Sequence, residues 1–450
     1  MKITLFSRPK IPLPSWPSLP VLVPHRLRRR FRSARSRLRS RQSPTTSIAC
    51  LKTSIRPEDT IRALRTHHWS VFDAQYLVLA VLGVFSLCVM QSPGPLVKTL
   101  IATLLLTGLI IPITRQVLLP ALPVLTWLVF FYSCQFVPAS YRPPISVRVL
   151  PALENIMYGA NLSNILAAHK STPLDILAWL PYGIFHYGAP FVVSALLFLF
   201  GPPGLLPVWA KSFGYMNLTG VIIQLFFPCS PPWYENMYGL APANYSIHGS
   251  PAGLAAIDEL FGIDLYTDAF TASPVAFGAF PSLHSGFATM EAFFMAHAFP
   301  KLRPLFVFYV CWLWWSTMYL SHHYAVDLVG GSLIAGVVFF IAKTRWLPRI
   351  QPGKAFRWDY DYVEFGDPAE EEFAYRKSRY GEYEGLDLDE YNMSPVTKFG
   401  DSDAWTLASS SGSVSSASRE LSAGLRSPAV ESLDGDTLAS CTDSEDYRKI

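Results

Sequence analysis

FPSLHSG at residues 280–286 and SHHYAVD at residues 321–327 enclose two apolar runs that meet at a basic turn, KLR at residues 301–303. As helices, residues 285–300 would rise about 24 Å and residues 302–320 about 28 Å, each close to the thickness of a bilayer core. Because Lys and Arg favour the cytosolic side of a membrane, we expect the turn to be cytosolic. The hairpin then brings both histidine clusters together on the opposite face.

The composition indicates a membrane protein. Half of the 450 residues are apolar, only 16% are charged, and the apolar residues occur in long blocks. The six cysteines show no C-x-x-C spacing, which argues against a zinc site and against a disulfide framework. We therefore expect no metal, no cofactor and no nucleic-acid partner.

The apolar blocks predict an all-α polytopic membrane protein, a helical bundle of about eight transmembrane spans, with six possible if the first two short blocks do not cross. Seven basic residues in the turns on one side of such a bundle, and after its last block, predict that this side and both termini are cytosolic. The predicted spans are residues 76–92, 97–113, 117–137, 176–200, 213–228, 285–300, 302–320 and 326–342. The basic residues are Arg115, Lys211, Lys301, Arg303, Lys343, Arg345 and Arg349.

Composition also sets the domain boundaries. Residues 1–70 form a basic arm whose first 57 residues contain no acid, and we expect this arm to be disordered and cytosolic. An organellar transit peptide is the alternative, although six prolines before residue 25 oppose the amphipathic helix that it needs. Residues 71–350 form the transmembrane catalytic domain. Residues 351–450 are acidic and rich in serine, which predicts a disordered cytosolic tail.

Two long segments, residues 138–175 and 229–281, fall on the same side of the membrane as the histidines. Loops of this length are uncommon unless they act as lids or binding surfaces, so we expect both to cover the site. Each contains a glycosylation sequon, at Asn161 and at Asn244.

His323 and Asp327 carry the chemistry together with His284. A spacing of four residues places His323 and Asp327 on one helical face, where the carboxylate can fix the imidazole tautomer and leave the other ring nitrogen free to attack. The hairpin adds His284 as acid and then base. Both clusters lie at expected helix N-termini, which favour an anion, so a phospholipid phosphorus is the expected electrophile. We interpret His322 as an interfacial or capping residue.

These stretches resemble the type 2 phosphatidic acid phosphatase superfamily, whose pattern ends in P-S-G-H and S-R-x5-H-x-x-x-D. More closely, the chain is similar to the catalytic subunits of the fungal inositol phosphorylceramide synthases, the targets of aureobasidin A. The similarity runs from about residue 60 to 350. It is carried by GAFPSLH at residues 278–284, STMYLSHHYAVD at 316–327, LPALEN at 150–155, FHYGAPF at 185–191 and PWYENMYG at 232–239.

That resemblance implies transfer of phosphoinositol from phosphatidylinositol to ceramide with release of diacylglycerol, on the lumenal face of the Golgi. It implies a phosphohistidine at His323, oriented by Asp327, and His284 as proton donor to the diacylglycerol oxygen and then as base for the ceramide hydroxyl. It also implies a small regulatory membrane subunit. Two inversions predict net retention at phosphorus.

The sequence departs from the superfamily pattern at its cationic positions. Leu283 replaces the Gly of P-S-G-H, Thr317 replaces the Arg of S-R, and no K-x6-R-P is found. A phosphodiester carries a single negative charge, so we expect weaker cationic contacts to suffice. The expected substrate-binding residues are Ser282, Ser285, Arg148 and Lys170.

Three alternatives stay open from the residues. The trio could deliver the phosphoryl group to water, as a lipid phosphate phosphatase does, or take its headgroup from another donor as a sphingolipid synthase. The histidines could also serve a transporter as a proton relay, which the scarcity of ionisable residues within the spans disfavours. Glu291 lies within a predicted span and receives no role.

Overall fold

The computed structural model describes residues 43–44, 51–360 and 362–365. The chain divides into two units, residues 1–409 and 410–450, and all the described residues belong to the first. Most of the predicted basic arm and of the predicted acidic tail therefore lies outside the described residues.

The structure describes short stretches of both the predicted arm and the predicted tail, and the domain boundaries stay a prediction. Helix α3 (Pro57–Arg65) lies within the predicted arm, and Lys52 exchanges hydrogen bonds of 2.9 Å with Gln116 of α6. After residue 350 the chain forms the 3₁₀ turn η8 (Arg357–Asp359), and Tyr360 is buried. The described residues on both sides of the predicted catalytic domain thus include regular structure.

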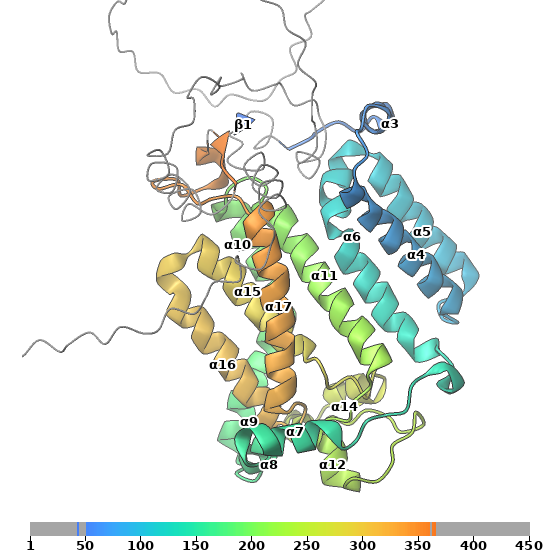
Figure 1. The fold of residues 1–450 in the computed structure, drawn as a ribbon, viewed down its shortest axis with the longest axis vertical. Coiled ribbons are helices and arrows are strands. Elements are labelled where there is room, and N and C mark those ends of the chain that lie inside the picture. The colour runs from blue at the N-terminus through green and yellow to red at the C-terminus, as the bar shows by residue number, and fades with distance from the viewer. Residues whose placement is uncertain (1–42, 45–50, 361, 366–450) are drawn as a thin grey trace, which may run out of the picture. The chain divides into compact units, whose positions relative to one another are not determined.

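Among the described residues, eight long helical stretches run back and forth, and each overlaps a predicted span (Figure 1). The fourth stretch combines α9, the π-helical turn η5 and α10 in one continuous helix. Their bounds are α4 (Ala74–Val89), α5 (Pro95–Ile110), α6 (Pro112–Ser133), α9 (Thr172–Trp179) with η5 (Leu180–Phe185) and α10 (His186–Phe200), α11 (Leu205–Phe226), α15 (Leu283–Ala298), α16 (Arg303–Tyr319) and α17 (Ala325–Arg345).

Within the described residues, four stretches are long and apolar enough to cross a membrane by length and composition, and the chain is a multi-pass membrane protein. They are Val71–Val89, Pro112–Phe136, Thr172–Phe200 and Ala325–Arg345, and Pro95–Ile110 is a shorter apolar helix. Helix α11 has the length, but it contains the polar residues Lys211, Asn217 and Gln224, which lower its mean hydropathy. All three are buried inside the bundle. The count of eight spans therefore stays a prediction.

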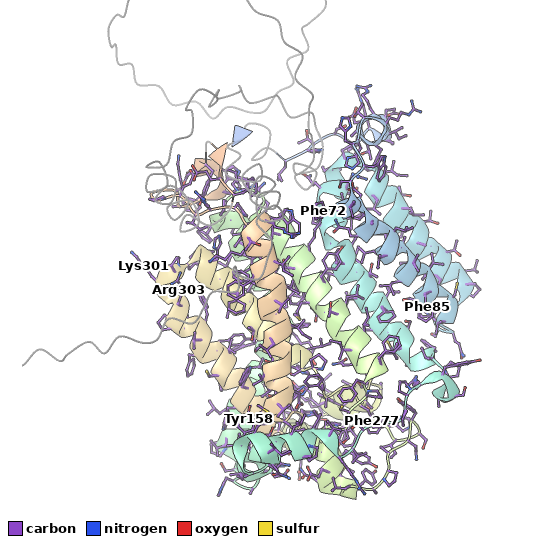
Figure 2. The ribbon with its side chains drawn as sticks, viewed as in Figure 1. Phe72, Phe85, Tyr158, Phe277, Lys301 and Arg303 are labelled. Atoms are coloured by element: carbon purple, nitrogen blue, oxygen red, sulfur yellow. The ribbon has the colours of Figure 1, made fainter. Side chains whose placement is uncertain are left out.

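The connections between the long helices separate into two ends. Figure 2 places Lys301 and Arg303 at one end and Tyr158 and Phe277 at the other. The second end, called the site end below, carries the short helices α7 (Val149–Tyr158), α8 (Leu162–Ala167), α12 (Pro232–Tyr238), α13 (Ala255–Phe261) and α14 (Leu265–Thr271) (Figure 1). The remaining regular elements are 3₁₀ turns and a two-residue antiparallel pair, β1 (Ser43–Pro44) with β2 (Tyr362–Val363).

Close backbone approach joins the helices that build the site. A Cβ at Gly331 of α17 would overlap the carbonyl oxygen of Ser282, and a Cβ at Gly214 of α11 would overlap the backbone of α6 at Pro123 and Val124. In a bilayer, small residues of this kind stabilise helix pairs through packing, since lipid supplies little hydrophobic drive between helices. The N-termini of α15 and α17 are thereby held side by side.

Candidate active site

His284, His323 and Asp327 form one hydrogen-bonded line at the site end. Nδ1 of His323 lies 3.0 Å from Oδ2 of Asp327, and Nε2 of His323 lies 3.0 Å from Nδ1 of His284. A carboxylate only accepts, so His323 carries its proton on Nδ1 and presents the Nε2 lone pair, to which Nδ1–H of His284 donates. The predicted meeting of the two histidine clusters is confirmed.

The loop that carries His323 is built by contacts of its backbone. The amides of His322 and His323 both donate to the carbonyl of Thr317, at 3.0 and 3.3 Å, and Ser321 adopts a left-handed φ of 61°. Thr317, where the superfamily pattern has Arg, is fully buried and donates its hydroxyl to the Trp314 carbonyl. The Thr317 position therefore faces the inside of the bundle, and a cation there would be buried.

The carboxyl of Asp327 is held as firmly as the imidazole it orients. Its Oδ2 also accepts from the amide of Tyr324 at 3.0 Å, and its own backbone carbonyl accepts from the amide of Ser282 at 3.0 Å. Asp327 is fully buried. The first turn of α17 and the first turn of α15 are thus joined directly behind the two histidines.

The N-terminus of α17 is already occupied. The carboxylate of Glu154, from α7, accepts from the amides of Ala325 at 3.2 Å and Val326 at 3.1 Å, and Glu154 is fully buried. The expectation that this helix end binds the phosphate of a substrate is wrong for these two amides, since a protein carboxylate takes the place of the anion.

The N-terminus of α15 is capped from within as well. The Ser282 hydroxyl accepts from the Ser285 amide at 3.3 Å, and the Ser285 hydroxyl donates to the Leu328 carbonyl at 2.6 Å. Both residues are fully buried. Their observed contacts position α15 against α17, and their predicted contact with substrate stays a prediction.

Arg148 and Lys170 are both exposed at the site end. Arg148 is the residue before α7. Lys170 lies close enough to His322 for its charge to act on that imidazole, whose pKa falls to about 3 because of burial, with smaller contributions from His323 and Lys170. Lys170 is therefore the better placed of the two predicted cations.

The interpretation of His322 changes with the structure. Its Nε2 lies 3.1 Å from the Pro251 carbonyl, and its ring packs 4.5 Å from Phe270 and 5.2 Å from Tyr182, measured between ring centres. The side chain is buried. His322 is thus part of the wall of the site and contacts the segment that covers it.

Sequence reasoning missed His186 as a member of the site. Its buried ring lies 4.7 Å from the rings of both His284 and Phe287, and its Nδ1 has no partner among the described residues. The π-helical turn η5, which ends one residue earlier, sets this orientation, and such turns are frequent at functional sites. The sequence did offer a signal, because His186 lies in the FHYGAPF stretch that supports the family resemblance, but that resemblance gave His186 no role.

The two long segments cover the site as predicted. The amide of Trp233 donates to Ser321, the amide of Gly253 donates to Leu320, and Glu235 accepts from Tyr324 at 2.8 Å. Glu235 also accepts from the side chain of Asn161 at 3.0 Å. Because Asn161 caps α8 and contacts the covering segment, its amide is engaged in the fold, whereas Asn244 is exposed.

A cavity of about 130 Å³ lies against His284, His322 and His323. Its other walls include Tyr182, Phe270, Leu283 and Trp233, so the reacting groups face an apolar space. Within the part of the chain that the structure describes, no group of three or more His, Cys, Asp or Glu side chains could hold a metal ion. The arrangement suits nucleophilic attack by an oriented imidazole beside a second imidazole.

The fold and this pair of imidazoles define a membrane-embedded enzyme of the PAP2 type, and a sequence model of the PAP2 superfamily matches residues 146–341. The chain is 53% identical over 345 residues to the inositol phosphorylceramide synthase catalytic subunit aur1 of Schizosaccharomyces pombe, which covers 77% of this chain and 82% of that relative. It is 47% identical over 325 residues to inositol phosphorylceramide synthase of Candida albicans, covering 72% and 69%. The chain belongs to the inositol phosphorylceramide synthase family.

A bacterial relative lies further away. The phosphoinositol dihydroceramide synthase of Bacteroides thetaiotaomicron is 26% identical over 243 residues, which cover 50% of this chain and 77% of that protein. No solved structure matches the chain.

Proposed function

We propose that this enzyme transfers phosphoinositol from phosphatidylinositol to ceramide, releasing diacylglycerol, and that His323 carries the phosphoryl group between the two lipids. The single observation that carries the proposal is the line of Asp327, His323 and His284, with both hydrogen bonds at 3.0 Å. It joins an oriented nucleophile to an acid and base. The names of the relatives supply the phosphoinositol group and the ceramide acceptor, and the family resemblance suggests phosphatidylinositol as the donor.

In the first step, phosphatidylinositol displaces the hydrogen bond between the two imidazoles. Nε2 of His323 attacks phosphorus as the bond from phosphorus to the diacylglycerol oxygen breaks, and protonated His284 donates its proton to that oxygen. The phosphohistidine carries a positive charge on its ring, which the buried carboxylate of Asp327 stabilises at Nδ1–H.

In the second step, neutral His284 removes the proton from the primary hydroxyl of ceramide. The alkoxide attacks phosphorus, the bond from phosphorus to Nε2 of His323 breaks, and His284 is again protonated. Each step inverts phosphorus, so we expect net retention, measurable with a phosphatidylinositol made chiral at phosphorus by sulfur and oxygen isotopes. The segments that cover the site keep water from competing with ceramide.

The location and the partner are also proposals. We infer that the site end faces the Golgi lumen and that both termini are cytosolic, supported by Lys301 and Arg303 at the opposite end (Figure 2). We also propose a small regulatory membrane subunit, which the family resemblance suggests. Protease protection of tagged termini in sealed Golgi vesicles, and co-purification of a small membrane protein, test these two points.

The test of the reaction uses detergent-solubilised protein with phosphatidylinositol and a fluorescent ceramide. A new anionic sphingolipid should form with the wild type and disappear in His323→Ala, while His68→Ala, an exposed histidine outside the site, should retain it. Release of inositol phosphate without labelled ceramide would instead show that water replaces ceramide as the acceptor, that is, hydrolysis of the donor.

The predicted cationic clamp has its own test. Lys170→Ala should raise the KM for phosphatidylinositol more than Arg148→Ala does, because Lys170 acts on the His322 ring. If both variants turned over like the wild type, neither residue would hold the phosphodiester.

A further inference from the structure

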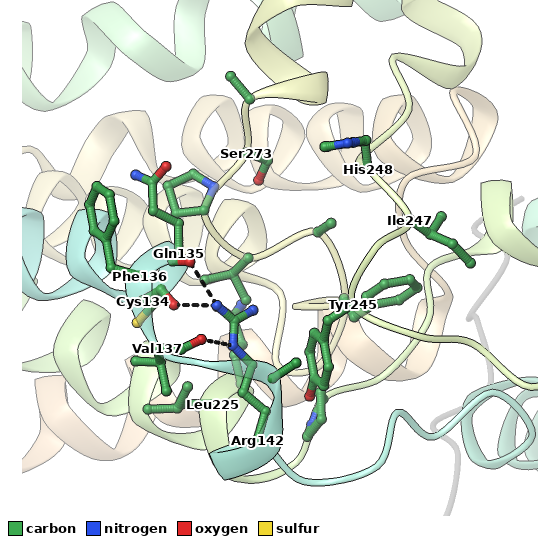
Figure 3. Close-up of a pocket in the computed structure, with 18 of the residues that line it drawn as sticks. Cys134, Gln135, Phe136, Val137, Arg142, Leu225, Tyr245, Ile247, His248 and Ser273 are labelled. Atoms are coloured by element: carbon green, nitrogen blue, oxygen red, sulfur yellow. Dashed lines mark hydrogen bonds between the residues drawn. The ribbon is translucent and has the colours of Figure 1, made fainter. Parts of the chain in front are cut away.

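A second and larger cavity, of about 640 Å³, opens at the site end and is shown in Figure 3. The chain segments that form it are the end of α6 with the turn η3 (Cys134–Phe136), the turn η4 (Ala139–Tyr141) with Arg142, the end of α11, the loop at residues 245–248, and residues 271–277. Its volume lies within the usual range for small-molecule sites. The mechanism above leaves this cavity unused, and we call it the η3 cavity.

The η3 cavity adjoins the cavity at the histidines. Both are lined by Gln224, Ser273, Val275 and Ala276, so these residues form their common boundary. Gln224, 4% exposed, fixes that boundary because its Nε2 donates to the carbonyls of Gly278 at 2.8 Å and of Pro281 at 3.0 Å. The two cavities therefore lie on either side of a shared wall that includes Gln224.

Arg142 supplies the only cationic side chain among the residues that line the η3 cavity. Its Nε donates to the Val137 carbonyl at 2.8 Å, and its Nη2 donates to the carbonyls of Cys134 at 2.7 Å and Gln135 at 3.0 Å. The guanidinium also lies over the Tyr245 ring, 4.8 Å from its centre. None of these bonds uses Nη1. Together they hold the guanidinium charge in a fixed position in the wall of the cavity (Figure 3).

The remaining polar groups of the cavity are neutral amides, hydroxyls and an imidazole, from Gln91, Gln135, His248, Thr271 and Ser273. Side chains of this kind both donate and accept, which suits a neutral molecule with many hydroxyls. A fixed cation disfavours choline and ethanolamine, because both are positively charged at neutral pH. The acceptor lipid offers few hydroxyls and fits the apolar walls beside the histidines better.

We propose that the η3 cavity binds the inositol ring of the donor lipid and that Arg142 selects against cationic headgroups. This inference rests on the proposed function, since it names the place of the donor headgroup in that reaction. The cavity lies at the ends of α6 and α11, the level at which lipid headgroups meet helix termini. Inositol in this cavity would direct its phosphodiester towards Gln224, which lines the smaller cavity together with His323.

The first test fills the cavity from an exposed position. Ala272→Trp should raise the KM for phosphatidylinositol in mixed micelles about tenfold, which corresponds to the loss of one or two hydrogen bonds between the headgroup and the cavity. The KM for ceramide should stay unchanged. Ala241→Trp is the matched control, because Ala241 is an exposed alanine of the covering segment that lines neither cavity. A rise in the ceramide KM alone would assign the cavity to the acceptor and overturn the proposal.

The second test adds myo-inositol 1-phosphate, a headgroup without lipid chains, as an inhibitor of the transfer reaction. The double variant Gln135→Ala with His248→Ala should require about tenfold more inhibitor for half inhibition. Arg142→Gln should increase transfer from phosphatidylcholine relative to phosphatidylinositol. Unchanged inhibition and unchanged headgroup preference would overturn the assignment, whereas a wild type that uses no phosphatidylinositol at all would overturn the proposed function itself.

Discussion

Glu154 offers the sharpest perturbation of the site, because it acts on the start of α17 from a different part of the chain. Its two carboxylate oxygens each accept one amide, from Ala325 at 3.2 Å and from Val326 at 3.1 Å. Glu154→Gln keeps the size of the side chain but replaces one acceptor oxygen by an amino group, which then faces an N–H. His323 precedes these amides and Asp327 follows them.

The magnitude follows from what the substitution removes. One hydrogen bond to a charged acceptor contributes about 1.5–3 kcal/mol, and a negative charge at a helix N-terminus adds about 0.3–1 kcal/mol. Burial raises the pKa of Glu154, which means that its ionised form costs free energy in the fold. Glutamine removes that cost, so the loss in unfolding free energy should be smaller than these contributions suggest.

Catalysis should be more sensitive than stability. Because about 1.4 kcal/mol corresponds to tenfold in rate, and a small misplacement of a catalytic group costs up to about a hundredfold, we expect kcat to fall between about tenfold and a hundredfold. The KM for each lipid should change little, since Glu154 lines neither cavity.

The assay is transfer to fluorescent ceramide, combined with thermal unfolding in detergent. Glu259→Gln is the matched control, because Glu259 is an exposed glutamate at the same end of the molecule, in α13. Glu154→Asp tests reach, as it keeps the charge but is one methylene shorter. The reasoning would be refuted by a Glu154→Gln enzyme whose kcat stays within twofold of the wild type.

Further predictions concern the other groups at the site. Burial lowers the pKa of both His322 and His323 from 6.5 to about 3. These two imidazoles therefore stay neutral in the folded protein at pH values where they bind protons in the unfolded chain. The free energy of unfolding should therefore fall as the pH drops from about 6.5 towards 3, by about 1.4 kcal/mol per pH unit for each histidine. His322→Gln should remove the contribution of one histidine from this pH dependence, as measured by thermal unfolding. His186→Asn should reduce kcat about tenfold, as expected for a lost positioning contact, without raising either KM, since the ring packs against His284; a matching tenfold loss of folded protein in thermal unfolding would point to general misfolding instead. In a glycosylating host, Asn244→Gln should change the electrophoretic mobility and Asn161→Gln should not. Activity should survive a metal chelator, and its loss would require a metal site in the reaction.

Local spacing and the order of apolar blocks were enough to predict the central chemistry. The four-residue spacing predicts the contact between His323 and Asp327, which forms although His323 lies in the loop before α17 and not on the helix as expected. The two runs between His284 and His323 return the chain to the same face. These relations involve neighbours along the chain or successive helices, so they survive without knowledge of packing. For the same reason, the helices appear where the hydrophobic blocks predicted them.

The tertiary structure alone decided which distant residues complete the site. Glu154 is 171 residues from the amide of Ala325 that it caps, His186 arrives from α10, and Arg142 shares its cavity with residues near 248 and 273. No period or motif encodes such meetings, because they depend on how helices rotate and pack against one another at glycine contacts such as Gly331. The sequence therefore determined which two histidines and which aspartate meet, and packing determined what occupies the helix end behind them and which cavities adjoin them.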